Sequence, residues 1–166
     1  MIPYDYYKYV VKPAMELYDE KFTLVYEPIT IAKQIIAVSM QESGLVTRRQ
    51  FGGGPARGYL QFEQYGVILD IVTRRNGSRF ARMFNLTLNE YMTLKETATE
   101  LYVAVEYNDI LGVMMMIDKY RLDHISIAND TTDDQRWDAY IKTWAPGKPR
   151  REHWGISCAA ARGAVG

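Results

Sequence analysis

Apolar residues recur every three or four positions through most of the chain, the spacing that places side chains on one face of a helix. The clearest case predicts a first helix over residues 4–20, with apolar positions at Tyr7, Val10, Val11, Ala14 and Leu17. Further helices are predicted on the same grounds over residues 31–43, 62–75, 96–106, 108–120 and 134–144. The alternation of apolar and polar residues that marks a half-buried strand is weak throughout. The pattern therefore predicts an all-α fold.

Residues that start or end helices divide this pattern into segments. Thr30 is placed to cap the second helix, and Gly44 stands just past its end. The run Thr87–Glu90 has the form of a capping box, which predicts another helix start. The glycine-rich stretch 45–58 is the one candidate for a short β-hairpin, and the small residues of about 159–166 predict a loose tail.

Composition limits the classes of protein to consider. The 166 residues fit one domain, taken here as residues 1–166. The formal net charge of zero argues against a nucleic-acid partner, because such proteins usually carry a basic excess. The longest apolar run, Ile110 to Ile117, is far shorter than the roughly 20 residues that span a bilayer. The N-terminal residues lack the pattern of a secretory signal, so we expect a protein made soluble in the cytoplasm.

Glu42 is the residue whose setting points to chemistry. It stands four positions after Val38 and continues the apolar stripe of its helix toward the core or a cleft. Burial disfavours a charged carboxylate, and so does the negative end of the helix dipole in the last turn. A carboxylic acid that keeps its proton near neutral pH can protonate the leaving oxygen in glycoside cleavage. The competing interpretation is a solvated surface glutamate near a helix end.

Two motifs around this glutamate resemble the lytic transglycosylase and goose-type lysozyme superfamily. The first is an apolar helix ending in Glu-Ser, here Ala37-Val-Ser-Met-Gln-Glu-Ser-Gly44, and the second, one loop later, is Gly58-Tyr-Leu-Gln61. The run Gln135–Ile141 is similar to the family's late helix, which carries a tyrosine facing the cleft. The stretch Tyr140–Pro149 looks like phage-encoded members of the group. The resemblance covers residues 31–154 and implies a lysozyme-like fold.

The resemblance implies a role for each matching residue. Glu42 would act first as general acid and then as general base, and Ser43 would orient the glutamate or the substrate. Gln61 would bind substrate near the scissile bond, and Tyr140 would reach the glutamate or the sugar from the opposite wall. No cofactor and no metal ion are implied. The substrate-binding set is therefore expected at Ser43, Gly58, Tyr59, Gln61 and Tyr140.

One motif of the family is missing. Its Ala-Tyr-Asn-Ala-Gly segment is represented only by Glu106-Tyr107-Asn108, so neither Tyr107 nor Asn108 is counted as a site residue. Hydrolysis usually needs two carboxylates; Glu63 and Asp70 are candidates for the second, although a solvated helix face explains them better. A lytic transglycosylase needs one, because the substrate's own 6-hydroxyl attacks and leaves a 1,6-anhydro sugar. We therefore favour transglycosylation and keep hydrolysis as the alternative.

Other candidate chemistry in the glycine-rich loop is weaker. Residues 52–58 lack the Gly-Lys-Ser/Thr ending and the preceding strand of a phosphate-binding loop. Arg48, Arg49 and Arg57 have two interpretations, as contacts to the anionic groups of peptidoglycan or as a solvated loop.

Metal and thiol chemistry find no supporting motif. His124 and His153 stand far apart, and no cluster has metal-ligand spacing. The single Cys158 excludes an internal disulfide and is interpreted as a packing thiol. The run Met114–Met116 predicts a buried helix with flexible apolar side chains.

These features predict an enzyme that cuts the glycan strands of peptidoglycan and opens the cell wall locally for a phage. It would act in the periplasm, either released from the host cytoplasm or carried in the virion, where other virion proteins would be its partners. The competing hypothesis is a virion structural component that keeps the lysozyme fold as a docking module, with weak or no catalysis. The Glu42 motif favours the enzyme, because a scaffold has no need of an acid there.

Overall fold

The computed structural model describes residues 1–74, 76–84, 86 and 92–166, and within these ranges the fold is all-α, as predicted. No sheet forms in this part of the chain, where two isolated antiparallel bridges are the β-type pairings. None of the described helices is long and apolar enough to cross a bilayer. In chain order the elements are α1 Pro3–Tyr6, η1 Tyr7–Val11, α2 Lys12–Phe22, α3 Pro28–Ser43, η2 Phe51–Gly53, η3 Gln64–Ile68, α4 Leu69–Thr73, α5 Gly77–Met83, α6 Leu94–Val105, α7 Asp109–Leu122, α8 Asp133–Trp144 and α9 Arg151–Val165.

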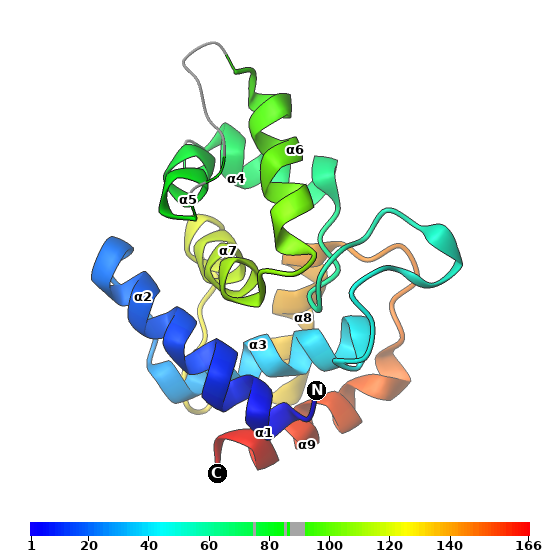
Figure 1. Cartoon of the computed structure of the whole chain (residues 1–166). Coiled ribbons are helices and arrows are strands. Elements are labelled where there is room, and N and C mark those ends of the chain that lie inside the picture. The colour runs from blue at the N-terminus through cyan, green and yellow to red at the C-terminus, as the bar shows by residue number, and fades with distance from the viewer. Residues whose placement is uncertain (75, 85, 87–91) are drawn as a thin grey trace.

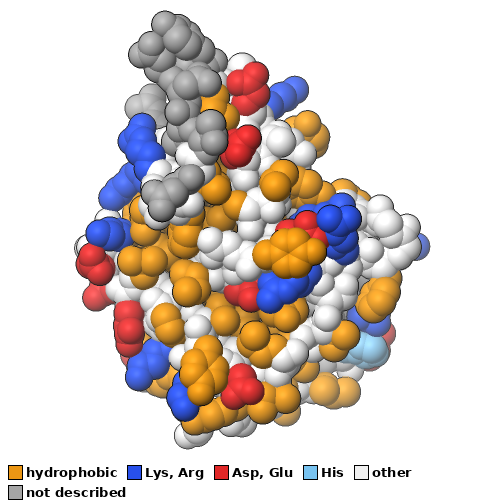
Figure 2. Space-filling model, viewed as in Figure 1, with side chains coloured by type: hydrophobic (Ala, Val, Ile, Leu, Met, Phe, Trp, Pro, Cys, Tyr) orange, Lys and Arg blue, Asp and Glu red, His pale blue; other side chains and the backbone are white. Residues whose placement is uncertain are grey.

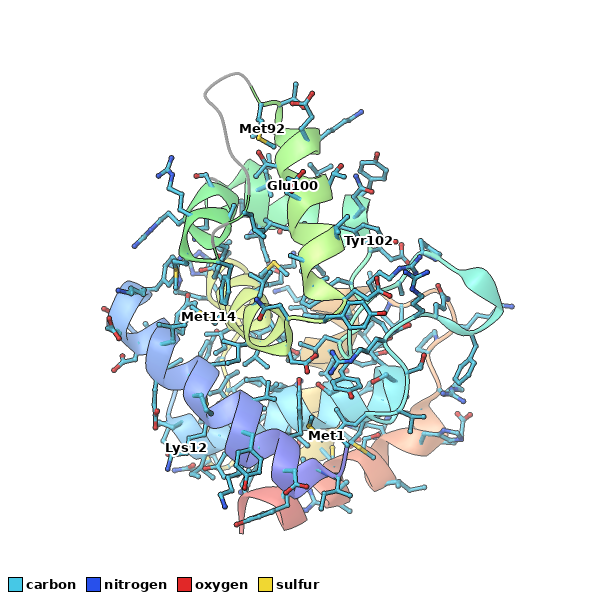
Figure 3. All side chains as sticks on the ribbon, in the orientation of Figure 1. Met1, Lys12, Met92, Glu100, Tyr102 and Met114 are labelled. Atoms are coloured by element: carbon cyan, nitrogen blue, oxygen red, sulfur yellow. The ribbon has the colours of Figure 1, made fainter. Side chains whose placement is uncertain are left out.

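Helix α7 lies at the centre of the core. Every residue from Leu111 to Tyr120 is buried, so the helix has no solvent-exposed face over that length. Helices α2, α3, α4 and α6 pack around it (Figure 1). Figure 3 shows Met114 of α7 inside the bundle, whereas Lys12 of α2 lies at its outside. The methionine run therefore fills the core, as its flexible side chains suit it to do.

The first helical segment runs continuously from Pro3 to Phe22 and contains one π-helical turn. Pro13 explains this turn, because its nitrogen has no hydrogen to donate to the carbonyl four residues earlier. The N–H of Lys12 bonds instead to the carbonyl of Tyr7, five residues back. A single π-helical turn accommodates the missing hydrogen bond, and the helix continues on both sides of it. The helix predicted over residues 4–20 is thus confirmed.

Helix α3 begins earlier than its pattern predicts and ends where expected. The cap is Glu27 rather than Thr30: its carboxylate accepts hydrogen bonds from the backbone of Thr30 and of the residue before it. Pro28 then occupies the first turn, where an N–H would have no helical partner in any case. At the other end Gly44 takes a left-handed φ of 61°, the conformation that favours glycine. Glu42 consequently lies in the last turn of the helix.

The middle of the chain departs most from the predicted helices. The helix predicted over 62–75 is divided at Gly66, whose backbone is not helical, and the helical part ends at Thr73. Helix α5 follows where only a turn at Asn76-Gly77 was predicted. The capping box at Thr87–Glu90 lies outside the described residues. The helices predicted over 96–106, 108–120 and 134–144 correspond to α6, α7 and α8.

The expectation of a loose tail at about 159–166 is wrong, because these residues belong to α9. Trp154, Cys158, Ala161 and Ala164 are buried on one face of this helix, which packs along α3. Figure 1 shows α9 beneath α3, close to the N-terminal segment. The small side chains that suggested disorder instead allow the two helices to approach each other closely.

The segment 45–62 doubles back without forming strands. Arg57 makes isolated antiparallel bridges to Arg49 and to Phe62, and these replace the expected hairpin. Gly52 and Gly53 turn the chain with φ values of 76° and 78°, in the left-handed region that glycine enters freely. The loop therefore folds back toward α3 with few backbone pairings.

The surface shown in Figure 2 carries basic and acidic side chains close to one another rather than a field of one sign. Charges of opposite sign also pair in the described part of the chain, as Arg74 does with Asp123 and Arg162 with Asp133. The arrangement agrees with the formal net charge of zero. This face therefore lacks the basic stripe that a nucleic-acid partner would need.

Candidate functional site

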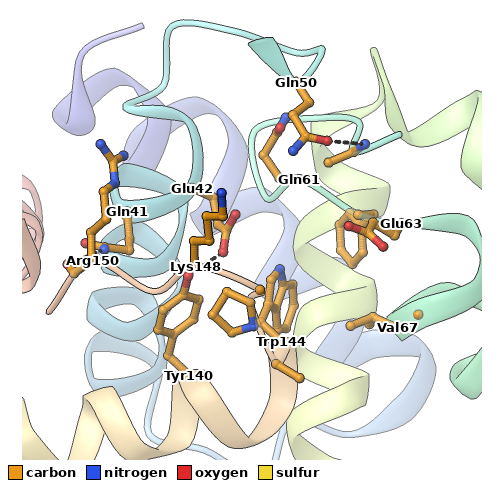
Figure 4. Close-up of a pocket in the computed structure, with 16 residues that line it drawn as sticks. Gln41, Glu42, Gln50, Gln61, Glu63, Val67, Tyr140, Trp144, Lys148 and Arg150 are labelled. Carbon is orange, nitrogen blue, oxygen red and sulfur yellow. Dashed lines mark hydrogen bonds between the residues drawn. The ribbon is translucent and has the colours of Figure 1, made fainter. Parts of the chain in front are cut away.

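A cavity of about 590 Å³, called the Glu42 cavity below, opens beside the last turn of α3. This volume falls in the range typical of small-ligand sites. Four parts of the chain form its walls: the end of α3, the segment 50–67, the end of α8 and the segment 145–150 (Figure 4). Of the residues predicted for the site, Glu42, Gln61 and Tyr140 line it. The other lining residues are Gln41, Gln50, Ala56, Phe62, Glu63, Gly66, Val67, Trp144, Ala145, Pro146, Gly147, Lys148 and Arg150.

The environment of Glu42 favours its neutral form. Burial raises the pKa of this carboxyl to about 7, well above its ordinary value of 4.5. The hydrogen bond from Tyr140 opposes that effect, the negative charge of Glu63 adds to it, and the positive charge of Arg150 reduces it. A carboxyl whose pKa is raised toward neutral pH can both give and accept a proton there.

Tyr140 holds the Glu42 carboxyl from the opposite wall. Its phenol donates a hydrogen bond to Glu42 Oε1 over 2.5 Å, from α8 across to α3. The tyrosine ring is fixed by the neighbouring indoles: it is stacked on Trp154 with centroids 5.4 Å apart and meets Trp137 edge-on. Burial and the charge of Glu42 raise the pKa of Tyr140 far above its ordinary value, so the phenol stays a donor.

We expect Tyr140→Phe to lower the rate of the reaction at Glu42 about tenfold, the worth of a hydrogen bond to a charged group. Because the lost bond favours the carboxylate, the pKa of Glu42 should rise. The alkaline limb of the pH–rate profile should then move to higher pH. Tyr26→Phe is the matched control, since its phenol bonds the carbonyl of Ile125 away from the cavity. A Tyr140→Phe enzyme with the wild-type rate and profile would remove Tyr140 from the site.

Gln61 reaches the cavity through an unusual backbone conformation. It has a left-handed φ of 52°, which turns the chain between Leu60 and Phe62. Its amide nitrogen donates to the carbonyl of Gly58 over 2.8 Å. This bond fixes the side chain and leaves the amide oxygen as the group that can accept a hydrogen bond from a ligand.

The other three residues of the predicted set lie behind the cavity wall. The Ser43 hydroxyl donates to the carbonyl of Tyr59 over 2.7 Å and so ties α3 to the segment that carries Gln61. The ring of Tyr59 lies beneath the Arg48 guanidinium, 4.3 Å from its centroid. Gly58 has φ 74°, and a Cβ there would stand 2.8 Å from the carbonyl oxygen of Val105. These residues position the wall rather than face the cavity.

Glu63 lines the same cavity as Glu42 and is exposed, so it is solvated as the sequence favoured, although it precedes a helix rather than lying on its face. It precedes η3 in extended conformation, which turns its side chain from the helix toward the cavity (Figure 4). Asp70 has a structural position instead: its carboxylate pairs with Lys119 and Arg74. The cavity thus contains two carboxyl groups, one from each wall.

Several lining residues were not singled out from the sequence. Gln41 donates to the backbone carbonyl of Arg150 over 2.8 Å and accepts a hydrogen bond from Ser157, which joins α3 to the start of α9. Trp144 donates from its indole nitrogen to the carbonyl of Leu60 over 2.8 Å. Both residues stood in the quoted sequence stretches, Gln41 in Ala37–Gly44 and Trp144 in Tyr140–Pro149, but neither was assigned a role.

The arginines of the glycine-rich loop are engaged within the protein. Arg48 pairs with Asp109, and Arg49 pairs with Glu106. Arg57 donates to two backbone carbonyls of its own loop. None of the three lines the Glu42 cavity.

Tyr107 and Asn108, left out of the predicted site, also lie away from the Glu42 cavity. The ring of Tyr107 is exposed, and the side chain of Asn108 caps α7 by accepting from the N–H of Leu111. The thiol of Cys158 is buried, which raises its pKa to about 12 and leaves it unreactive. Among the described residues no group of histidine, cysteine and carboxylate side chains has the arrangement of a metal site.

No model of a known protein family, no characterised protein and no solved structure matches the chain.

Proposed function

We propose that this protein cleaves the glycan strands of peptidoglycan, with Glu42 as the single acid and base. One observation carries the proposal: a half-buried carboxyl with a pKa near 7 faces a cavity large enough for a sugar unit. The motifs ending at Glu42 and Gln61, which resemble those of lytic transglycosylases and goose-type lysozymes, agree with it.

The proposed reaction uses Glu42 twice. In the first step the neutral carboxyl donates its proton to the glycosidic oxygen, and the C1–O bond breaks as the leaving sugar takes that proton. In the second step the resulting carboxylate accepts the proton of the muramyl 6-hydroxyl, whose oxygen bonds to C1 and gives a 1,6-anhydro sugar. The Tyr140 phenol stabilises the carboxylate between the two steps, because its hydrogen bond favours the charged form.

Hydrolysis is the second candidate, and the position of Glu63 is the observation that favours it. Glycosidases that use water commonly place two carboxyl groups on either side of the scissile bond. Glu63 is on the wall facing Glu42 and could activate a water molecule there. If hydrolysis operates, Glu63→Gln removes activity almost as completely as a change at Glu42, whereas transglycosylation tolerates it.

Products distinguish the two reactions. Purified peptidoglycan is digested with the protein and the soluble fragments are analysed by mass. We expect anhydro-muropeptides, which are lighter by one water than the reducing-end products of hydrolysis. Fragments with reducing ends would assign the enzyme as a lysozyme, and the absence of any released glycan would contradict the proposed function.

The biological setting is also a proposal, which rests on the stretch Tyr140–Pro149 and its resemblance to phage-encoded proteins. In that setting the enzyme opens the wall locally, either from within an infected cell or from an entering particle. Detection of the protein in purified virions would support carriage in the particle, and its presence only in lysates would favour release from the host cell.

A further inference from the structure

Two cations at the mouth of the Glu42 cavity lie on the segment between α8 and α9. Lys148 and Arg150 line the cavity, and both side chains are exposed. Figure 4 shows them on the side of the cavity where Glu42 and Gln41 also lie, across from Glu63. The segment is held in place from α3, because Gln41 donates a hydrogen bond to the Arg150 carbonyl over 2.8 Å.

These cations differ from the arginines of the glycine-rich loop. Arg48 and Arg49 have carboxylate partners on the protein. In contrast, no carboxylate of the described residues lies within ion-pair distance of Lys148 or Arg150. Two cations that share a cavity mouth and form no ion pair with a described carboxylate attract an anionic ligand.

We propose that Lys148 and Arg150 form a rim that binds the carboxylates carried by the glycan strand, an inference that rests on the proposed function. The guanidinium of Arg150 can grip a carboxylate with two parallel hydrogen bonds, and the Lys148 ammonium acts as a point charge beside it. The muramyl sugars of peptidoglycan carry such groups, either as the free lactyl carboxylate or in the attached peptide. Glycans built only of N-acetylglucosamine are neutral. The rim therefore makes the enzyme prefer peptidoglycan over uncharged strands.

The position of Arg150 indicates where along the cavity the carboxylate of the substrate would bind relative to Glu42. Arg150 lines the same cavity as Glu42, and Figure 4 shows both side chains at its wall. A carboxylate bound by the rim would thus belong to a sugar at or next to the scissile bond. Binding there aligns the glycosidic oxygen with the acid, so part of the binding energy serves orientation.

The test pairs a change in the protein with a change in the substrate. Lys148→Met/Arg150→Met is compared with wild type on intact peptidoglycan and on the same material after its carboxyl groups have been amidated. We expect kcat/KM on intact peptidoglycan to fall about 2- to 30-fold, the worth of two exposed ion pairs. On the amidated material wild type and variant should be nearly equal. The loss should appear mainly in KM and should shrink as salt is added.

Lys95→Met/Lys142→Met is the matched control, because it removes two exposed positive charges that lie outside the cavity. This variant should cleave both substrates at the wild-type rate. An equal loss in the rim variant on intact and amidated peptidoglycan would overturn the proposal, and so would an equal loss in the control variant.

Binding without cleavage separates this inference from the proposed function. Sedimentation with insoluble peptidoglycan measures binding by the Glu42→Gln variant, which does not cleave. The difference between this variant and the same variant with Lys148→Met/Arg150→Met gives the contribution of the rim to binding. If wild type cleaves no glycan but Glu42→Gln binds the wall through Lys148 and Arg150, the rim stands and the catalytic proposal fails. If wild type cleaves and the rim variant is unaffected, only the rim fails. An amidase removes the peptide and in the same step frees the lactyl carboxylate: a retained effect shows that the lactyl carboxylate is sufficient for the rim, and a lost effect assigns the carboxylates of the peptide.

Discussion

Glu42→Gln is expected to lower the rate of glycan cleavage by about 100- to 10,000-fold, the range that a general acid–base group contributes. Glutamine keeps the size of the side chain and can still accept the hydrogen bond from Tyr140. The glutamine amide has no acidic proton to give to the leaving sugar oxygen, so the glycosidic C1–O bond cannot break at the catalysed rate. The measurement is release of soluble fragments from purified peptidoglycan. A variant that retains full activity would exclude Glu42 as the acid.

The same substitution should leave the chain folded and raise its stability in alkaline solution. The folded-state pKa of Glu42 is about 7, whereas an unfolded glutamate titrates near 4.5. Stability from this group is fully present below pH 4.5 and is lost as the pH rises through 7. Glu42→Gln should therefore gain about 3 kcal/mol over wild type at pH 8 and almost nothing at pH 4.5. Chemical denaturation at the two pH values measures this difference.

Gly58→Ala is expected to destabilise the protein by about 2–4 kcal/mol. Its left-handed φ of 74° costs any other residue about 1 kcal/mol. The added Cβ would also stand 2.8 Å from the carbonyl oxygen of Val105, which is backbone of α6 and has little freedom to move. Overpacking of this kind adds about 1–3 kcal/mol. Chemical or thermal unfolding of the purified variant measures the loss.

Gly53→Ala provides the matched control for this loss. Gly53 has a similar φ of 78°, but a Cβ there would meet nothing within 4 Å. Its replacement should cost only the backbone part, about 1 kcal/mol. The difference between the two variants then isolates the close approach of the Gly58 segment to α6. Equal losses would mean that α6 moves aside and that Gly58 is needed only for its turn.

The helices could be predicted because most of them bury one face, and the residues of a buried face recur as apolar positions at helical spacing in the sequence. The pattern gave α6, α7 and α8 nearly at their observed ends, and Gly44 marked the end of α3. It failed for α9, where alanine and cysteine occupy the buried face and carry a weak apolar signal. It also failed at Gly66, where a local backbone departure divides a helix without changing its composition.

The site was partly predictable for a different reason. Glu42 and Tyr140 belong to motifs that resemble a known family, so their meeting across the cavity was expected although 98 residues separate them. Glu63, Lys148 and Arg150 join them through tertiary packing that no local pattern encodes. Their side chains meet only once α3, the 50–67 segment and the 145–150 segment have been brought together.

The contact between α3 and α9 also has a consequence for the order of folding. It joins residues that lie more than a hundred positions apart, as Gln41 and Ser157 do through their 116-residue separation. Contacts of such high sequence separation form late, because the entropy of closing the intervening chain must be overcome first. During synthesis the side of α3 that packs against α9 stays uncovered until residues 151–165 have left the ribosome. A nascent chain that stops short of them has made Glu42 but lacks the contacts that hold the neighbouring Gln41, so this wall of the Glu42 cavity is complete only once α9 has formed.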